Sequence, residues 1–143
     1  MSMEMPGALR FAGYASVFDK IDHGGDIVRR GAFSRAISAG GGGLPLLWQH
    51  DEKQPIGRIE KIEEDARGLR VIGRITRASH GGQDAAALVG EGAVSGLSIG
   101  YRPVRAARRR NGARELTDLD LIEISLVTFP MQPLARVHAV AEG

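Results

Sequence analysis

The chain has 143 residues, 43% of them hydrophobic, and a formal net charge of +2. This length suits one core, so we expect residues 1–143 to form a single domain, and the near balance of charge argues against a nucleic-acid-binding surface over the whole molecule. The absence of cysteine excludes disulfides, thiolate metal sites and cysteine nucleophiles, and we expect neither a signal peptide nor a membrane span, because no sufficiently long apolar run occurs.

The amino-terminal third predicts a strand, a loop and a short helix. Residues 8–18 alternate and carry aromatic side chains, which is typical of a strand. Residues 19–33 are rich in Asp and Gly and predict a long ordered loop. Ser34 is placed to cap a short helix that ends at the glycine run 40–43. The 20 glycines of the chain, about twice the usual ~7%, favour many tight turns and a compact β structure.

The middle of the chain contains the clearest hairpin signal. LPLLWQH (44–50) predicts an apolar strand. The segments 56–64 and 69–76 flank the turn DARG, and both alternate apolar with charged residues. One face of this hairpin is therefore expected to be buried and the other to be wet.

The carboxy-terminal half predicts a helix over 81–92 and two long strands. The first strand, AVSGLSIGYRPV, is joined to the second, over 115–129, by a turn at Asn111-Gly112. The second strand is apolar on both faces, which is typical of a strand covered on both sides. With about six or seven strands and a few short helices, we expect a mainly β fold: a small, closed, mainly antiparallel β-barrel.

Ser98 is the candidate nucleophile. It lies in the stretch VSGLSIGY, where Gly96, Ser98 and Gly100 make a small-residue face. Small neighbours leave a substrate room to approach the hydroxyl, and backbone N–H groups near glycine can point at an oxyanion. Ser95 and Ser125 are the competing serines.

A nucleophilic serine needs a base, and His50 is the candidate. It ends the apolar strand and shares a face with Trp48 by alternation, so it is placed to face a cleft from a rigid element. An ordinary hydrogen-bonded histidine at a strand end would show the same pattern. The other histidines fall in a loop, a turn and the terminal tail: His23, His80 and His138.

Glu123 is the candidate third member. A carboxylate in a strand that is apolar on both faces is costly to bury without a partner. Two partners satisfy this need equally well: an arginine on a neighbouring strand (Arg58, Arg70 or Arg74), or the imidazole of His50.

Metal and nucleic-acid chemistry fit the pattern less well. Four residues could be assembled into a metal site but show no close ligand spacing: His23, Asp26, His50 and Asp51. The arginine cluster straddles the expected turn without interleaved aromatic residues, so a solvated hairpin tip explains it better than a nucleic-acid interface: Arg105, Arg108, Arg109 and Arg110.

Four stretches, in order, resemble the prohead serine proteases of tailed bacteriophages, which are related in fold to herpesvirus assemblin. They are GYASVFDKIDHGGDIVRRGAF (13–33), LPLLWQHD (44–51), SGLSIGY (95–101) and LIEISLVTFPMQPLA (121–135). The likeness extends from about residue 9 to 140.

The resemblance implies a herpesvirus-protease-like domain in which Ser98 is the nucleophile, His50 the base and Glu123 the acidic third member. It implies no cofactor and no metal. The implied substrates are the scaffolding protein or the scaffold-like arm of the major capsid protein, together with the protease itself. Cleavage would occur inside an assembling procapsid in the bacterial cytoplasm, for a phage or a phage-like particle.

The same resemblance involves no membrane and no nucleic acid, and it leaves homo-oligomerisation open. Three rival functions remain from the sequence, and one of them is an esterase or amidase of similar chemistry that acts on a small substrate. The other two are a non-catalytic barrel that binds capsid or scaffold protein and a small nucleic-acid-binding β-barrel.

Overall fold

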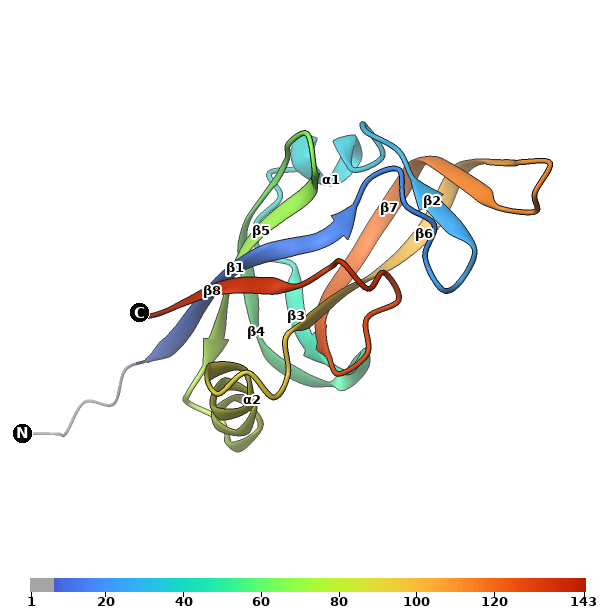
Figure 1. The fold of residues 1–143 in the computed structure, drawn as a ribbon. Coiled ribbons are helices and arrows are strands. Elements are labelled where there is room, and N and C mark those ends of the chain that lie inside the picture. The colour runs from blue at the N-terminus through green and yellow to red at the C-terminus, as the bar shows by residue number, and fades with distance from the viewer. Residues whose placement is uncertain (1–6) are drawn as a thin grey trace, which may run out of the picture.

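The computed structural model describes residues 7–143, which form a mainly β structure with eight strands and two short helices (Figure 1). The strands are β1 (Ala8–Val17), β2 (Asp26–Val28), β3 (Pro45–Trp48), β4 (Asp51–Glu64), β5 (Gly68–Thr76), β6 (Gly96–Arg108), β7 (Arg114–Val127) and β8 (Val137–Glu142). The helices are α1 (Ser34–Ser38) and α2 (His80–Gly90). Neither helix in this described range is long and apolar enough to cross a membrane.

Strand β7 is the organising element of the sheet, because it pairs with three other strands. The long strand β6 pairs with it in antiparallel fashion, while β2 and β3 pair with it in parallel. From β3 the sheet continues through β4, β5, β1 and β8. In the β3–β7 pair Leu46 lies opposite Ile124 and Trp48 opposite Leu126. This pairing brings the end of β3, and the histidine that follows it, beside the middle of β7.

The expected closed barrel is not confirmed, because the described strands form no ladder between β8 and β6. Two backbone hydrogen bonds link the start of β6 to the chain around residues 135–137: Leu97 N–H to the Ala135 carbonyl (3.0 Å) and Val137 N–H to the Ser95 carbonyl (2.8 Å). On its other side the segment 128–136 accepts the Tyr14 N–H of β1 at the Arg136 carbonyl (3.1 Å). The segment contains Pro130 and Pro133, which lack an N–H group and cannot continue a ladder. The closing strand is therefore replaced by a loop.

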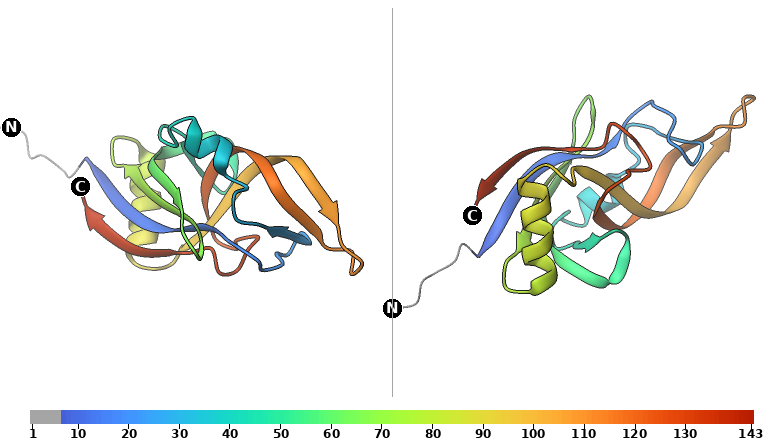
Figure 2. Two further views of the ribbon diagram at one scale, coloured as in Figure 1. Left: turned by 90° about the horizontal axis from the view of Figure 1, so that it is seen from above. Right: turned by 60° about the horizontal axis from the view of Figure 1, so that its bottom comes forward.

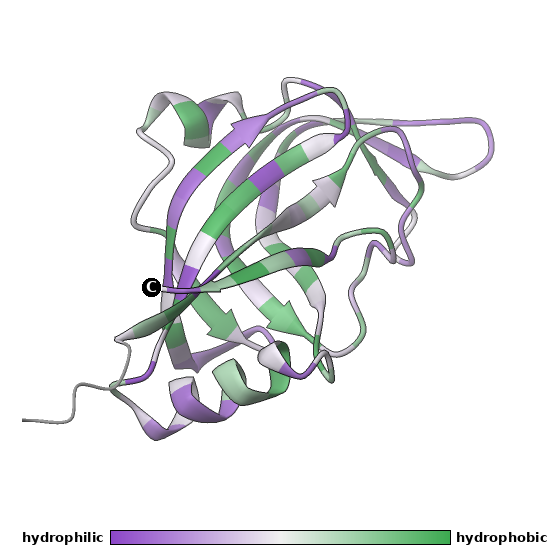
Figure 3. Cartoon of the chain, turned by 60° about the vertical axis from the view of Figure 1, so that its left-hand side comes forward, coloured by the Kyte–Doolittle hydropathy of each residue, from purple (hydrophilic) through white to green (hydrophobic). Residues whose placement is uncertain are grey.

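The core fills the space enclosed by the curved sheet, where apolar residues alternate with polar ones along the strands (Figure 3). The largest fully buried side chains include Phe33, Leu46, Ile59, Leu97 and Ile124. Helix α2 covers one end of the enclosed space and buries Ala85, Ala86 and Val89. It begins after Ser79, whose hydroxyl accepts the Gly82 N–H at 3.0 Å and caps the first turn.

The β6–β7 hairpin projects from the body as a two-stranded ribbon (Figure 2). Residues 102–112, on the β6 side and in the turn, are exposed, as expected for a solvated tip around Asn111-Gly112, whereas Ala113 and Leu116 on the other side are buried beside β2. The expectation that β7 is buried on both faces is correct only for residues 123–127. Farther out, Ile122 is 44% exposed because no layer covers the ribbon there.

Candidate active site

The tip of the β3–β4 hairpin holds His50. Trp48 and Asp51 pair across a two-residue loop, and both loop residues have positive φ, 56° for Gln49 and 60° for His50. Two left-handed residues in a two-residue loop correspond to a type I′ turn, which normally favours Asn and Gly. The expectation that His50 extends the apolar strand is therefore wrong: it follows that strand, at the second position of a turn.

Contacts with β7 hold this turn in place. The Gln49 N–H donates to the Leu126 carbonyl at 2.9 Å, and the Gln49 side chain donates to the Thr128 hydroxyl at 2.8 Å. The Thr128 N–H in turn donates to the Gln49 side-chain oxygen at 3.1 Å. A strained conformation persists where its surroundings fix it in several ways, so these bonds explain how a glutamine and a histidine occupy the turn.

Glu123 is the partner of the His50 ring. Their Oε1 and Nδ1 atoms lie 2.6 Å apart, and since an ionised carboxylate only accepts, Nδ1 is the donor. The other carboxylate oxygen, Oε2, accepts the Ser125 hydroxyl at 2.8 Å. The Ser125 Oγ also accepts the His50 backbone N–H at 3.1 Å. Among the described residues none forms a hydrogen bond with Nε2 of the imidazole, so this atom is available for other chemistry.

Gly100 makes room for the Glu123 carboxylate. The two residues lie opposite each other in the β6–β7 pair, and a Cβ added to Gly100 would lie 2.4 Å from Oε1 of Glu123. Any side chain at position 100 would therefore collide with the carboxylate. The glycine of the small-residue face has a specific function: it permits the acid to reach the histidine.

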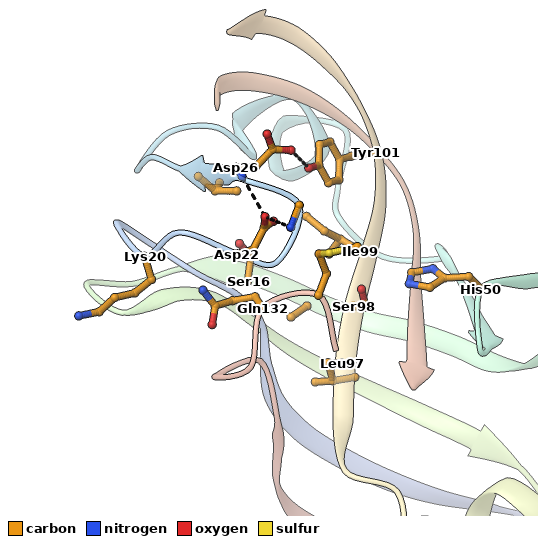
Figure 4. Close-up of a pocket in the computed structure, with 14 residues that line it drawn as sticks. Ser16, Lys20, Asp22, Asp26, His50, Leu97, Ser98, Ile99, Tyr101 and Gln132 are labelled. Atoms are coloured by element: carbon orange, nitrogen blue, oxygen red, sulfur yellow. Dashed lines mark hydrogen bonds between the residues drawn. The ribbon is translucent and has the colours of Figure 1, made fainter. Parts of the chain in front are cut away.

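Ser98 lies on the same face of the β6–β7 pair, opposite Ser125, because residues two apart on a strand point the same way. It is only 5% exposed, and it lines a pocket of about 150 Å³ together with His50. Figure 4 shows the His50 ring directed from its hairpin toward Ser98. Within residues 7–143 no hydrogen bond joins the two side chains, which is common for catalytic pairs without substrate.

The structure separates Ser98 from the competing serines. Ser125 is fully buried, so a substrate cannot reach it, and its hydroxyl donates a hydrogen bond to the Glu123 carboxylate. The Ser95 hydroxyl accepts a hydrogen bond from Arg136 at 3.2 Å and does not line the pocket.

The remaining candidates lie elsewhere or have other partners. His80 begins α2 and His138 lies in β8, not in a loop or tail as expected, with its ring 5.7 Å from the Tyr14 ring. Arg70 and Arg74 pair with glutamates of β4 and not with Glu123. No group of three potential metal ligands comes together in the described part of the chain.

The far wall of the pocket contains a buried acid that sequence reasoning considered only as a metal ligand. Asp26 accepts two hydrogen bonds from the Arg114 guanidinium, at 2.8 and 2.9 Å, and a third from the Tyr101 hydroxyl at 2.5 Å. The Arg114 contact, helped by Tyr101, holds the pKa of Asp26 below its usual value. Burial, together with the bond to Asp26, raises the pKa of Tyr101. These interactions fix the outer wall beside the β2 strand.

The caudovirus prohead serine protease model matches residues 2–143. The chain belongs to this family. Among curated prohead proteases, that of Enterobacteria phage HK97 is 32% identical over 138 residues, covering 91% of this chain and 59% of the relative. The prohead protease of Escherichia phage T5 is 28% identical over 129 residues, covering 87% of this chain and 59% of the relative. The chain thus spans less than two thirds of the length of both prohead proteases.

Solved structures show the same fold at low sequence identity. The capsid assembly protease gp21 of bacteriophage T4 has a TM-score of 0.70 at 13% identity, with 84% of this chain and 81% of gp21 covered. The KSHV protease in complex with a hexapeptide phosphonate inhibitor has a TM-score of 0.60 at 12% identity, with 95% and 66% covered. Identities this low establish the fold and do not transfer any residue's role.

Proposed function

We propose that this prohead protease family member is a serine endopeptidase, and that residues 1–143 form its single protease domain. Its substrates would be segments of scaffolding or major capsid protein inside an assembling procapsid in the bacterial cytoplasm, and the protease chain itself. The observation that carries the proposal is the position of His50, which is bonded to Glu123 through Nδ1 and directed toward Ser98 on its other side.

In this mechanism Nε2 of His50 takes the proton of the Ser98 hydroxyl as Oγ attacks a peptide carbonyl carbon. Glu123 keeps the proton on Nδ1, which fixes the tautomer, and stabilises the imidazolium that forms. His50 then gives its proton to the leaving amine. In the second half a water molecule, deprotonated by His50, attacks the acyl ester, and His50 returns that proton to Ser98 Oγ as the acyl C–O bond breaks. No metal or cofactor takes part in these steps.

The loop 129–136 lies beside the nucleophile, since Met131 and Gln132 line the same pocket as Ser98. Backbone N–H groups of this loop or of the glycine-rich strand β6 would stabilise the oxyanion. Beyond Ile99 the edge of β6 opposite β7 has no strand partner within residues 7–143. An extended substrate would bind there by strand addition.

The test is co-expression with the cognate capsid and scaffolding proteins. Ser98→Ala is expected to abolish their truncation while the protein stays folded, because losing one hydroxyl at this position costs well under ~1 kcal/mol. Ser95→Ala is the matched control: the same chemical change three residues away is expected to leave processing intact. Normal processing by Ser98→Ala would reject the nucleophile.

A serine-reactive probe separates this function from the non-catalytic alternative. Labelling at Ser98 in the wild-type protein identifies an enzyme, and a folded, assembled protein that resists labelling identifies a capsid- or scaffold-binding barrel. Salt-dependent binding to DNA through the arginine ribbon would instead favour the nucleic-acid module.

A further inference from the structure

The pocket that contains Ser98 is also lined by three charged side chains, Lys20, Asp22 and Asp26, of which Asp22 lies on its far side. Figure 4 shows Asp22 and His50 on opposite sides of Ser98. Asp22 lies in the loop before β2, is partly buried, and lines the pocket. The proposed catalysis leaves this carboxylate without a role.

Within the described residues, no salt bridge neutralises the carboxylate of Asp22. Its Oδ1 accepts the backbone N–H groups of Gly24 and Asp26 at 2.8 and 2.9 Å, while Oδ2 has no hydrogen-bond partner within residues 7–143. No Lys, Arg or His of that range forms a salt bridge with it. Lys20 lines the same pocket, but its ammonium points away from Asp22 in Figure 4.

The neighbouring Asp26 differs from Asp22 in the partners of its carboxylate. Its carboxylate is buried, whereas that of Asp22 is partly buried, and both Asp26 oxygens are bonded to Arg114 and one also to Tyr101. The two acids differ accordingly in electrostatics: Arg114 lowers the pKa of Asp26, whereas burial raises the pKa of Asp22. A partly buried carboxylate with an oxygen that makes no hydrogen bond to the described residues gains from a cation that enters its pocket.

The rest of the pocket suits the stem of a long side chain. Ala15, Val28, Leu97, Ile99 and Met131 supply an apolar lining. A cavity of about 150 Å³ is large enough for a benzene-sized group, and so for one substrate side chain. Lysine and arginine carry an apolar stem with a cationic end, which matches an apolar pocket with a carboxylate at its far side.

We propose that Asp22 is a specificity residue that selects lysine or arginine as the substrate residue whose carbonyl Ser98 attacks. The inference rests on the proposed function. The pocket reaches Ser98 itself, and the side chain closest to an attacked carbonyl carbon is the one on the adjacent α-carbon. That side chain enters the pocket with its methylene groups against the apolar lining and its cation on Oδ2 of Asp22.

Three aminoalkyl diphenyl phosphonate probes test this inference. They differ only in the side chain beside phosphorus: that of lysine, of norleucine, which has a similar stem without the ammonium, and of glutamate. Each probe forms a Ser98 Oγ–P bond and releases phenol, so intact mass measures the rate and peptide mapping identifies the site. We expect the wild-type protein to react about 10- to 100-fold faster with the lysine probe than with the norleucine probe, the size of one charge-assisted hydrogen bond.

Asp22→Asn is expected to remove this preference and leave the norleucine rate unchanged, because the amide oxygen still accepts the Gly24 and Asp26 N–H groups. Asp22→Lys is expected to favour the glutamate probe. Asp84→Asn, an exposed position on α2, makes the same charge change far from the pocket and is expected to keep the lysine preference.

The possible outcomes separate the two proposals. Equal lysine and norleucine rates at Ser98 in the wild-type protein would overturn the specificity of Asp22 while supporting the serine protease. A folded wild-type protein that none of the three probes labels at Ser98 would overturn the protease and the inference with it. If Asp22→Asn failed to fold, the wild-type rate ratio would still decide.

Discussion

Replacing Glu123 with glutamine removes one negative charge and keeps the shape of the side chain. The present carboxylate has Oε1 2.6 Å from Nδ1 of His50 and accepts the Ser125 hydroxyl on Oε2 at 2.8 Å. An amide can serve only one of these contacts with an oxygen. If its nitrogen faces the imidazole, Nδ1 must become the acceptor and the proton moves to Nε2, where it blocks the base.

The size of the effect follows from the charge that develops on His50. Two unit charges about 4 Å apart interact by about 4 kcal/mol at an effective dielectric constant near 20. The His50 side chain is 41% exposed, so water weakens this interaction. We expect a loss of about 2.7 kcal/mol of transition-state stabilisation, which is about a hundredfold in rate at ~1.36 kcal/mol for each factor of ten.

The assay combines two measurements on one preparation of Glu123→Gln: the rate of labelling of Ser98 by a phosphonate probe, and the thermal unfolding midpoint. We expect slow labelling in a folded protein. A stable variant that labels at the wild-type rate would remove Glu123 from the catalytic unit. A large fall in stability with normal labelling per folded molecule would show that the carboxylate only holds the β3–β4 turn in place.

Two further substitutions examine the same unit. His50→Ala is expected to be as inactive as Ser98→Ala in phosphonate labelling and capsid-protein processing, and the double variant no worse, because removing either residue stops the shared step; losses that multiply would show that His50 acts through stability or binding instead. Gly100→Ala is expected to lower both stability, by about 1–3 kcal/mol, and the labelling rate, because the new methyl group would lie 2.4 Å from the Glu123 carboxylate. Gly81→Ala, where the added carbon makes only ordinary contacts at 3.8 Å, is its control, and equal behaviour of the two glycine variants would contradict the steric argument.

Much of the fold could be predicted from local patterns. The alternating segments 56–64 and 69–76 lie within β4 and β5, and the alanine-rich stretch 81–92 corresponds to α2. What local patterns could not supply was pairing between distant segments. The parallel contact of β3 with β7 joins residues about 78 positions apart, Leu46 with Ile124, and no short-range signal encodes it. Strand β8 was missed because two prolines precede it and its side chains are mostly exposed.

The three candidate catalytic residues could be chosen from the sequence, but the hydrogen bonds that hold them in position could not be predicted. Ser98, His50 and Glu123 could each be selected by residue type and position, and the structure brings all three to one place. Ser125 was considered only as a competing nucleophile, although its spacing of two from Glu123 puts both on one face of β7. Its bond to Glu123 follows from that shared face, but its bond to the His50 backbone depends on the β3–β7 pairing, which the sequence does not reveal.

The left-handed turn at Gln49 and His50 implies a conflict between the stability of the turn and the proposed catalytic role of His50. Asparagine followed by glycine would fit this backbone better than the present pair. That replacement would therefore be the obvious choice for raising the thermal stability of the protein. Such a replacement would remove the imidazole at position 50. Under the proposed mechanism this turn therefore does not have its most stable sequence, and screens that rank variants by melting temperature alone would favour variants without the base at these two positions.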